Sequence, residues 1–401
     1  MTPGELLSHP AVRHARAAIH ARDTQTLREQ IELVQIPAPS LQEEERAHEV
    51  LARFAAAGLA GTRIDEVGNV LGRLPAMGNG TPEEGAVVVC AHLDTVFPAG
   101  TDLSVRRQGE RILAPGITDN ARGLAAMLAL VRVMVESGIS TSRPLVFAAT
   151  VGEEGIGDLR GVKHLFREGA PLHTASACVA LDGSGVRRIV NRAVGSRRLR
   201  IRILGPGGHS WADWGTANAV HALASAVAEM RALPLPPSPR TTLSVTRVGG
   251  GTSVNSIPAE AWLELDIRSE NQEALERLDG DARDTSQRAA AAENRQRRRG
   301  TGALKVQVEC IGDRPSGKTP AQAALVRAAL AATRAIGERP MLVASSTDAN
   351  VPISLGIPAV TLGAGGESGG IHTTEEWYSN EGGPEGIERA LLTLLAVAGL
   401  I

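Results

Sequence analysis

Short, continuous apolar runs are the feature of this sequence that most restricts its fold. They include Val87 to Cys90, Leu145 to Thr150 and Cys178 to Leu181, and a stretch with the apolar content of a helix, Leu124 to Val135, lies between the first two. Continuous apolar runs of this length indicate strands that are covered on both faces. Strands that alternate with helices favour a mostly parallel sheet flanked by helices, so we expect an α/β fold.

The sequence pattern changes after about Val194 and changes back near Pro320. Between these points it predicts strand, helix, two strands, helix and strand, a βαββαβ order typical of a small α+β sandwich. The clearest of these elements are a strand at Leu199 to Leu204, a helix at Ala217 to Leu233 and a strand at Leu304 to Cys310. We therefore expect a main domain made of residues 1–193 and 316–401, into which residues 194–315 are inserted as a lid.

Composition and charge exclude several classes of protein. The 401 residues are 43% hydrophobic, yet no apolar stretch reaches the roughly 20 residues of a membrane-spanning helix. A net charge of −2 gives no reason to expect nucleic acid or a membrane surface as a partner. The N-terminus lacks the apolar segment of a secretory signal, so we expect a cytoplasmic protein. Cys90, Cys178 and Cys310 are widely separated, and we interpret them as buried thiols on strands.

Five segments place acidic or imidazole side chains at the carboxyl ends of predicted strands, where an open α/β sheet forms its ligand crevice. The segment VVVCAHLDTVF places His92 and Asp94 on the same side of a strand, where the carboxylate can accept the second imidazole N–H and orient the ring as a metal ligand. A lone pair of this kind is more often an ordinary satisfied histidine. Asp119 in GITDNARG can equally be a helix N-cap. Asp182 in CVALDGSG can be a turn residue.

Two further segments are harder to explain as structure alone. In VFAATVGEEGIGDLRG the adjacent Glu153 and Glu154 follow an apolar strand, and burying two like charges is costly unless cations are present. One glutamate can then coordinate a metal while its neighbour accepts a proton from water held by the metal. In GAGGESGGIHTTEEW, His372 follows a glycine-rich loop that allows close approach of a substrate. These loops predict a metal centre, and their imidazole and carboxylate ligands suit zinc, with cobalt or manganese possible.

The segments AHLDTV, GITDN, GEEGIG, LDG and GGIHTTEEW together resemble the M20 family of metallopeptidases, over most of the chain. The resemblance implies a zinc-exopeptidase-like main domain that binds two metal ions. His92 and Asp182 would hold one ion, Glu154 and His372 the other, and Asp119 would bridge them. Asp94 would orient His92, and Glu153 would be the general base and later the proton donor.

The resemblance also extends to the inserted residues. It implies a ferredoxin-like domain that forms the interface of a homodimer. In GPGGHSW, His209 would reach the scissile carbonyl, from the same subunit or from its partner. In SVNSIPAEAWLELDIRS, Asn255 and Arg268 would bind polar or carboxylate groups of the substrate. Without the resemblance, a surface arginine at a strand end is the preferred explanation of Arg268.

The family has several activities, and the sequence favours one of them. Asp182 stands where several carboxypeptidases and deacylases of the family carry glutamate, which indicates an aminopeptidase or a di- or tripeptidase acting on short peptides. An N-acyl-amino-acid deacylase or a glutamate-carboxypeptidase-like enzyme on the same scaffold remains the alternative. A non-catalytic metal-binding or peptide-binding protein is disfavoured because no expected ligand is missing. The glycine clusters lack the GxGxxG spacing of a nucleotide-binding dehydrogenase.

Overall fold

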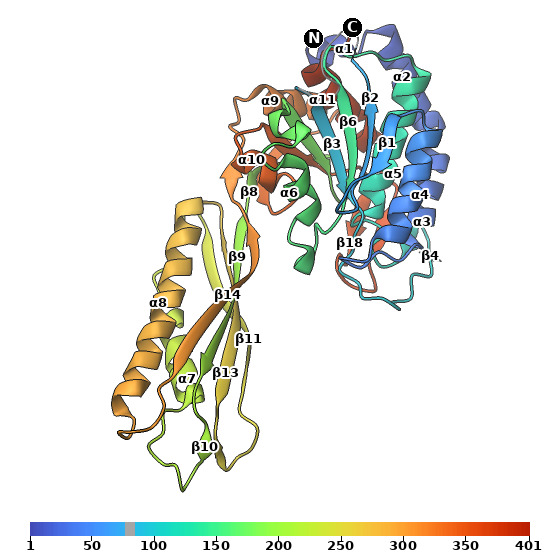
Figure 1. Cartoon of the computed structure of the whole chain (residues 1–401). Coiled ribbons are helices and arrows are strands. Elements are labelled where there is room, and N and C mark those ends of the chain that lie inside the picture. The colour runs from blue at the N-terminus through green and yellow to red at the C-terminus, as the bar shows by residue number, and fades with distance from the viewer. Residues whose placement is uncertain (77–84) are drawn as a thin grey trace. The chain divides into compact units, whose positions relative to one another are not determined.

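The computed structural model describes residues 1–76 and 85–401 (Figure 1). The chain divides into two compact units. Unit 1 consists of Met1–Ala193 and Lys318–Ile401, and unit 2 consists of Val194–Gly317. Each unit encloses its own hydrophobic core.

Unit 1 is built on a mixed sheet with the strand order β1-β2-β6-β3-β7-β17-β8-β15, in which β16 also pairs with β8. The central strands β6, β3, β7 and β17 run parallel to one another, whereas β1 and β2 add an antiparallel edge. The strands are β1 (Ala60–Ile64), β2 (Val70–Leu74), β3 (Val87–His92), β6 (Leu145–Thr150), β7 (Ala177–Leu181), β8 (Arg188–Ala193), β15 (Gly317–Lys318), β16 (Met341–Ser345) and β17 (Ala359–Leu362). The predicted mostly parallel α/β sheet is confirmed.

Helices cover both faces of this sheet because side chains alternate along each central strand. On β3, Val87, Val89 and Ala91 face the larger core, while Val88 and Cys90 face the smaller one. The larger core contains α1 (Pro3–Leu6), α2 (Pro10–Ala21), α3 (Asp23–Val34), α4 (Glu44–Ala56), α5 (Ala121–Glu136), α9 (Ala324–Ala335) and α11 (Gly383–Ala398). The smaller core contains α6 (Arg160–Phe166) and α10 (Asn350–Ser354). This two-sided burial explains why the strands are continuous apolar runs.

A small antiparallel sheet lies outside the main one in unit 1. Its order is β18-β19-β5-β4, with β4 (Arg106–Gln108), β5 (Arg111–Leu113), β18 (Glu367–Gly369) and β19 (Trp377–Ser379). Pairing of Trp377 with Leu113 joins parts of the chain that are far apart in sequence. It brings the segment that follows β18 beside the loop that precedes α5.

Unit 2 has the predicted βαββαβ order. Its antiparallel sheet has the order β11-β13-β9-β14, and α7 and α8 pack against each other and against this sheet (Figure 1). The elements are β9 (Gly195–Leu204), α7 (Ala219–Arg231), β11 (Thr241–Gly250), β13 (Glu260–Ser269), α8 (Gln272–Gln296) and β14 (Lys305–Arg314). Two short strands, β10 (Gly208–His209) and β12 (Ser256–Ile257), pair with each other beyond one end of the sheet.

Two expectations about composition can be compared with the structure. Cys90 and Cys178 are buried on β3 and β7 with their sulfurs 3.8 Å apart, as expected for core thiols. Cys310 is exposed, so the expectation of a buried thiol is wrong there; it lies on β14, an edge strand of unit 2 that faces solvent along much of its length. In the part of the chain that the structure describes, no helix combines the length and the apolar character needed to cross a bilayer.

Candidate metal centre

Three of the predicted metal ligands come from adjacent parallel strands of the main sheet. His92 is the last residue of β3, Glu154 follows β6, and Asp182 follows β7. Because β6, β3 and β7 are neighbours and run in the same direction, their carboxyl ends meet at one edge of the sheet. The amide of Asp182 also donates to the carbonyl oxygen of Leu362 at the end of β17, which fixes this loop to the sheet.

Asp119 and His372 reach the same edge from loops next to the small sheet, not from strands of the main sheet as the sequence suggested. Asp119 lies between β5 and α5, and His372 lies between β18 and β19 with a left-handed backbone φ of 66°. The N-cap of α5 is Asn120, whose side-chain oxygen accepts from the amide of Gly123. The carboxylate of Asp119 is therefore not needed for capping.

The five side chains converge. The Nε2 atom of His372 lies 3.0 Å from Oε1 of Glu154 and 3.1 Å from Oδ2 of Asp119. The Nε2 atom of His92 lies 2.9 Å from Oδ1 of Asp119 and 3.9 Å from Oδ1 of Asp182. Asp119 thus has one oxygen beside each imidazole, the arrangement expected of a carboxylate that bridges two ions.

These residues fit divalent metal ions. His92, Asp119 and Glu154 each offer a ligand atom within 4.8 Å of the other two. Ligand atoms bound to one zinc ion at about 2.0–2.2 Å lie roughly 3–3.5 Å from one another, close to the separations found here. Moreover, Oδ1 of Asp119 is buried, and a neutral His92 whose proton is on Nδ1 offers it no donor. A buried carboxylate oxygen without a donor is costly, and a cation at this position would satisfy it.

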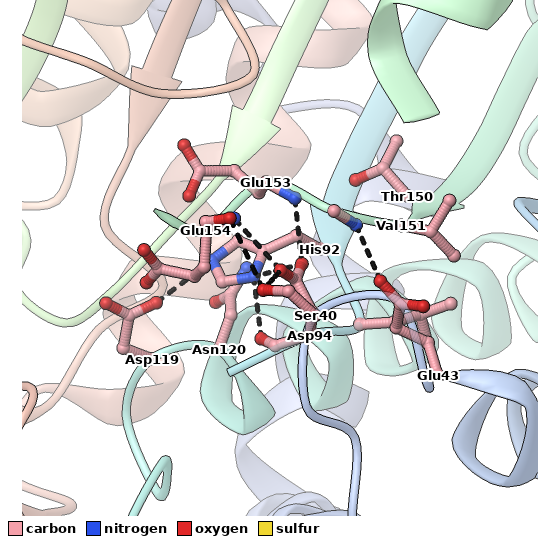
Figure 2. A network of polar contacts seen from close by, with 12 residues as sticks. Ser40, Glu43, His92, Asp94, Asp119, Asn120, Thr150, Val151, Glu153 and Glu154 are labelled. Atoms are coloured by element: carbon pink, nitrogen blue, oxygen red, sulfur yellow. Dashed lines mark hydrogen bonds and ion pairs between the residues drawn. The ribbon is translucent and has the colours of Figure 1, made fainter. Parts of the chain in front are cut away.

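Asp94 ties the metal ligands together, as Figure 2 shows. Its Oδ1 accepts from the amide of Glu153 and its Oδ2 from the amide of Glu154, both at 2.9 Å. The Nδ1 atom of His92 lies 3.0 Å from the backbone oxygen of Asp94 and 3.5 Å from its Oδ1. These acceptors place the imidazole proton on Nδ1 and leave Nε2 available as a ligand.

The pKa values of His92 and His372 reflect the carboxylates that surround both rings. Burial lowers the pKa of His92, but hydrogen bonds to Asp119, Asp182 and Asp94 outweigh burial and raise this pKa well above its usual value. Hydrogen bonds to Asp119 and Glu154 raise the pKa of His372 to about 10. The carboxylates therefore attract positive charge to both imidazoles, either as protons or as metal ions.

Comparison with known proteins agrees with this geometry. The model of peptidase family M20/M25/M40 matches residues 88–396, which is more than three quarters of the chain. The chain belongs to this family. Its matched segment contains all five converging ligands together with Asp94 and Glu153.

Similar proteins include peptidases and a related amidohydrolase. The structure of aminopeptidase PepT from Bacillus cereus is 28% identical, with a TM-score of 0.74, and covers 93% of this chain and 98% of that one. A tripeptidase structure from Staphylococcus aureus is 25% identical, also with a TM-score of 0.74, and covers 94% and 98%. The succinyl-diaminopimelate desuccinylase of Corynebacterium glutamicum is 26% identical over 59% of this chain, and the aligned region spans 64% of that relative.

Residues that precede the family match brace the centre, and the sequence did not reveal them. Ser40 donates a hydrogen bond of 2.6 Å to Oδ2 of Asp94 (Figure 2). Glu43 accepts from the amide of Gly152, immediately before Glu153. The buried guanidinium of Arg46 donates to the carbonyl oxygen of Leu93 at 2.8 Å. The only available signal was a serine and a glutamate three residues apart in an otherwise ordinary loop.

A buried aspartate near the centre was also missed. Asp348 is 3% exposed and accepts a hydrogen bond from the hydroxyl of Thr150, the last residue of β6. Burial raises the pKa of this carboxyl to about 6. Its segment, SSTDAN, has the composition of an ordinary loop, which gave no reason to single it out.

Unit 2 carries the remaining candidates, His209, Asn255 and Arg268. The exposed His209 lies on β10, and its Nδ1 accepts from the amides of Trp211 and Ala212, so the ring proton is on Nε2. The backbone oxygen of Asn255 accepts from the amide of Ser210, which places Asn255 beside this loop. Arg268 lies near the far end of β13 and donates to Asp266. Unit 2 therefore brings His209 and Asn255 together but not Arg268.

Proposed function

We propose that the chain is a dinuclear metal exopeptidase, an aminopeptidase or di- or tripeptidase that hydrolyses short peptides with zinc as its metal. The observation that carries this proposal is the convergence of two imidazoles and three carboxylates beside Glu153, whose backbone amide is fixed by Asp94. Membership of a peptidase family supports the broader class, a hydrolase of peptide or amide bonds.

Each residue has a distinct task in this proposal. Divalent ions held by the five ligands would acidify water and polarise the carbonyl group of the substrate. Glu153, which is 4% exposed, takes the proton of the attacking water and later returns it to the leaving amine. Asp94 binds the backbone amides of Glu153 and Glu154 and lies beside the ring of His92, so that the base and these two ligands keep a fixed separation.

The choice of short peptides rests on two observations. The structures that match nearly the whole chain at 25–28% identity are described as an aminopeptidase and a tripeptidase. Asp182, rather than a glutamate, lies at the end of β7 beside His92. Both favour removal of an N-terminal residue.

The variant Glu153→Gln tests the proposed base. The amide keeps the size of the side chain but cannot take up a proton, so we expect kcat on the best tripeptide to fall by a factor of about 100 or more. The metal content should stay at two ions per chain, measured by atomic emission. Turnover near that of the wild type would contradict the assignment of Glu153.

An N-acyl-amino-acid deacylase is the second candidate, and the similarity to a desuccinylase favours it. The two activities differ in the group that flanks the scissile amide. Free tripeptides, N-blocked peptides and N-succinyl and N-acetyl amino acids should be assayed side by side with zinc, cobalt or manganese. Hydrolysis of the acylated amino acids at higher kcat/KM than the free peptides would replace our proposal by this one.

His209, Asn255 and Arg268 are the proposed substrate contacts of unit 2. An Nε2–H donor at His209 can stabilise the oxyanion that develops on the scissile carbonyl. Arg268 lies eight positions after Glu260 on β13, a span of about 25 Å at the rise of an extended strand. One unit 2 cannot place both ends of its sheet on one short peptide. We therefore propose a homodimer in which two copies of unit 2 contribute to each site.

A further inference from the structure

Glu376 follows the segment that carries His372 and is completely buried just before β19. Its carboxylate accepts three backbone N–H bonds from a single loop. Oε1 accepts from the amides of Thr118 and Asp119 at 2.8 and 3.0 Å, and Oε2 accepts from the amide of Gly116 at 3.0 Å. The loop Gly116–Asp119 is thus wrapped around this one side chain.

The conformation of this loop needs an acceptor at this point. Gly116 has a left-handed φ of 81°, and a side chain there would meet the methyl group of Thr95 at 2.9 Å. The amides of Gly116, Thr118 and Asp119 bind this carboxylate, not the backbone oxygens of a neighbouring strand. Each buried N–H left without an acceptor would cost about 1–3 kcal/mol. Only an ionised carboxylate offers acceptors on both oxygens and no competing donor.

The loop and the segment of Glu376 are joined by more than this carboxylate. The backbone oxygen of Glu376 accepts from the amide of Ala114 at 3.1 Å, and Thr118 donates through its hydroxyl to the backbone oxygen of Trp377. His372 stands only four residues before Glu376. The buried side chain of Glu376 therefore links the loop of Asp119 to the segment that carries His372, and both residues are predicted metal ligands.

We propose that Glu376 is a positioning residue that sets the metal-bridging carboxylate of Asp119 by binding the backbone amides of its loop, without touching the metals itself. This role rests on the metal centre described above, but it does not depend on which substrate the enzyme cleaves. It predicts that replacing the carboxylate of Glu376 by an amide weakens metal binding although every ligand is retained.

The variant Glu376→Gln tests this role, with Co²⁺ as the probe metal. Glutamine keeps the shape but turns one acceptor into a donor that faces an N–H group. We expect Co²⁺ affinity, measured by titration of the visible absorption of the bound ion, to fall by a factor of about 10–100. The shape of that absorption should change as well, because the geometry of Asp119 changes.

Glu375→Gln is the matched control. Glu375 is the preceding residue, its side chain is 69% exposed, and it pairs with Arg106 at the surface. The substitution makes the same chemical change one position earlier in the sequence. It leaves the hydrogen bonds between Glu376 and the loop of Asp119 intact. We expect its Co²⁺ affinity and absorption to match those of the wild type.

Rescue by metal separates positioning from a general loss of structure. At saturating Co²⁺, Glu376→Gln should regain kcat to within a few-fold of the wild type. Unchanged Co²⁺ affinity and absorption in the folded variant would overturn the proposal, even if its Tm falls. If Glu376→Gln does not fold, Glu376→Asp takes its place: the shorter carboxylate cannot reach all three amides, so unchanged Co²⁺ affinity in that variant would equally overturn it.

These outcomes are distinct from failure of the proposed function. A wild-type chain that binds Co²⁺ but cleaves no peptide would contradict the peptidase proposal alone. A chain that cleaves peptides, with equal Co²⁺ affinity in Glu376→Gln and the wild type, would contradict the role of Glu376 alone.

Discussion

Asp94 connects three functional groups through one buried carboxylate. It contacts the imidazole of His92 and accepts from the amides of Glu153 and Glu154. Burial raises the pKa of Asp94, but its hydrogen bonds outweigh burial and keep this pKa below the usual value, so the carboxylate stays ionised. An ionised acceptor forms stronger hydrogen bonds than a neutral one, and the separation of base and ligand is held correspondingly firmly.

Ser40→Ala is expected to loosen this arrangement. The Ser40 hydroxyl donates to Oδ2 of Asp94 and also lies 3.3 Å from the backbone oxygen of Glu154. Loss of a hydrogen bond to a charged group costs about 1.5–3 kcal/mol, so kcat/KM should fall by a factor of roughly 10–100. Steady-state kinetics at saturating metal measures the effect.

Ser104→Ala is the matched control for Ser40→Ala. It removes a serine-to-aspartate hydrogen bond of the same kind, from Ser104 to Asp102, on the exposed surface. Its kcat/KM should equal that of the wild type. Equal kinetics in both variants would show that Asp94 does not need the Ser40 hydroxyl.

At the scale of secondary-structure elements, the main sheet was predictable and the small sheet was not. Strand β6 has the predicted bounds, because continuous burial makes every residue of it apolar except the last, Thr150. Strands β4, β5, β18 and β19 are three residues long each, and β4 (Arg106–Gln108) is exposed and polar. They exist through long-range pairing, which local sequence does not encode. The sequence therefore identified Asp119 and His372 as candidates but not the elements that bring them together.

Tyr378 on β19 allows the integrity of this small sheet to be followed in solution. It is the only tyrosine of the chain, it is fully buried, and its hydroxyl donates to Asn380. Burial raises its pKa to about 12. Tyrosinate absorbance after a rapid pH jump should therefore rise with a midpoint near 12 in the native chain and near 10 in the urea-unfolded chain.

The same shift predicts how stability depends on pH. Because the folded pKa of Tyr378 lies above the unfolded one, its contribution is fully present below about pH 10 and is lost as pH rises toward 12. The full loss amounts to about 3 kcal/mol in the free energy of unfolding. Urea unfolding of Tyr378→Phe should show a flatter decline across this range, and an identical decline in both proteins would contradict the assignment.

At the scale of the whole molecule, the residues proposed for catalysis are divided between the two units. All metal ligands and Glu153 belong to unit 1, whereas His209 belongs to unit 2. Unit 2 presents His209 and Asn255 beyond one end of its sheet and Arg268 near the other. Chains joined in a two-fold dimer can place opposite ends of two such sheets at one site. The dimer is then part of the catalytic proposal.

Mixing two inactive variants tests whether His209 acts across such a dimer. Glu153→Gln lacks the base in unit 1, and His209→Ala lacks the donor in unit 2. If His209 serves the partner's site, a mixed dimer has one site with Glu153 from one chain and His209 from the other. Random exchange of equal amounts would make about a quarter of all sites intact, and about a quarter of wild-type activity should appear in peptide hydrolysis.

If His209 serves its own chain, each site in the mixed dimer lacks one group, and mixing restores no activity. Sedimentation of the mixture, with one variant fluorescently labelled, verifies that mixed dimers have formed. Mixed dimers without recovered activity would rule out action across the dimer.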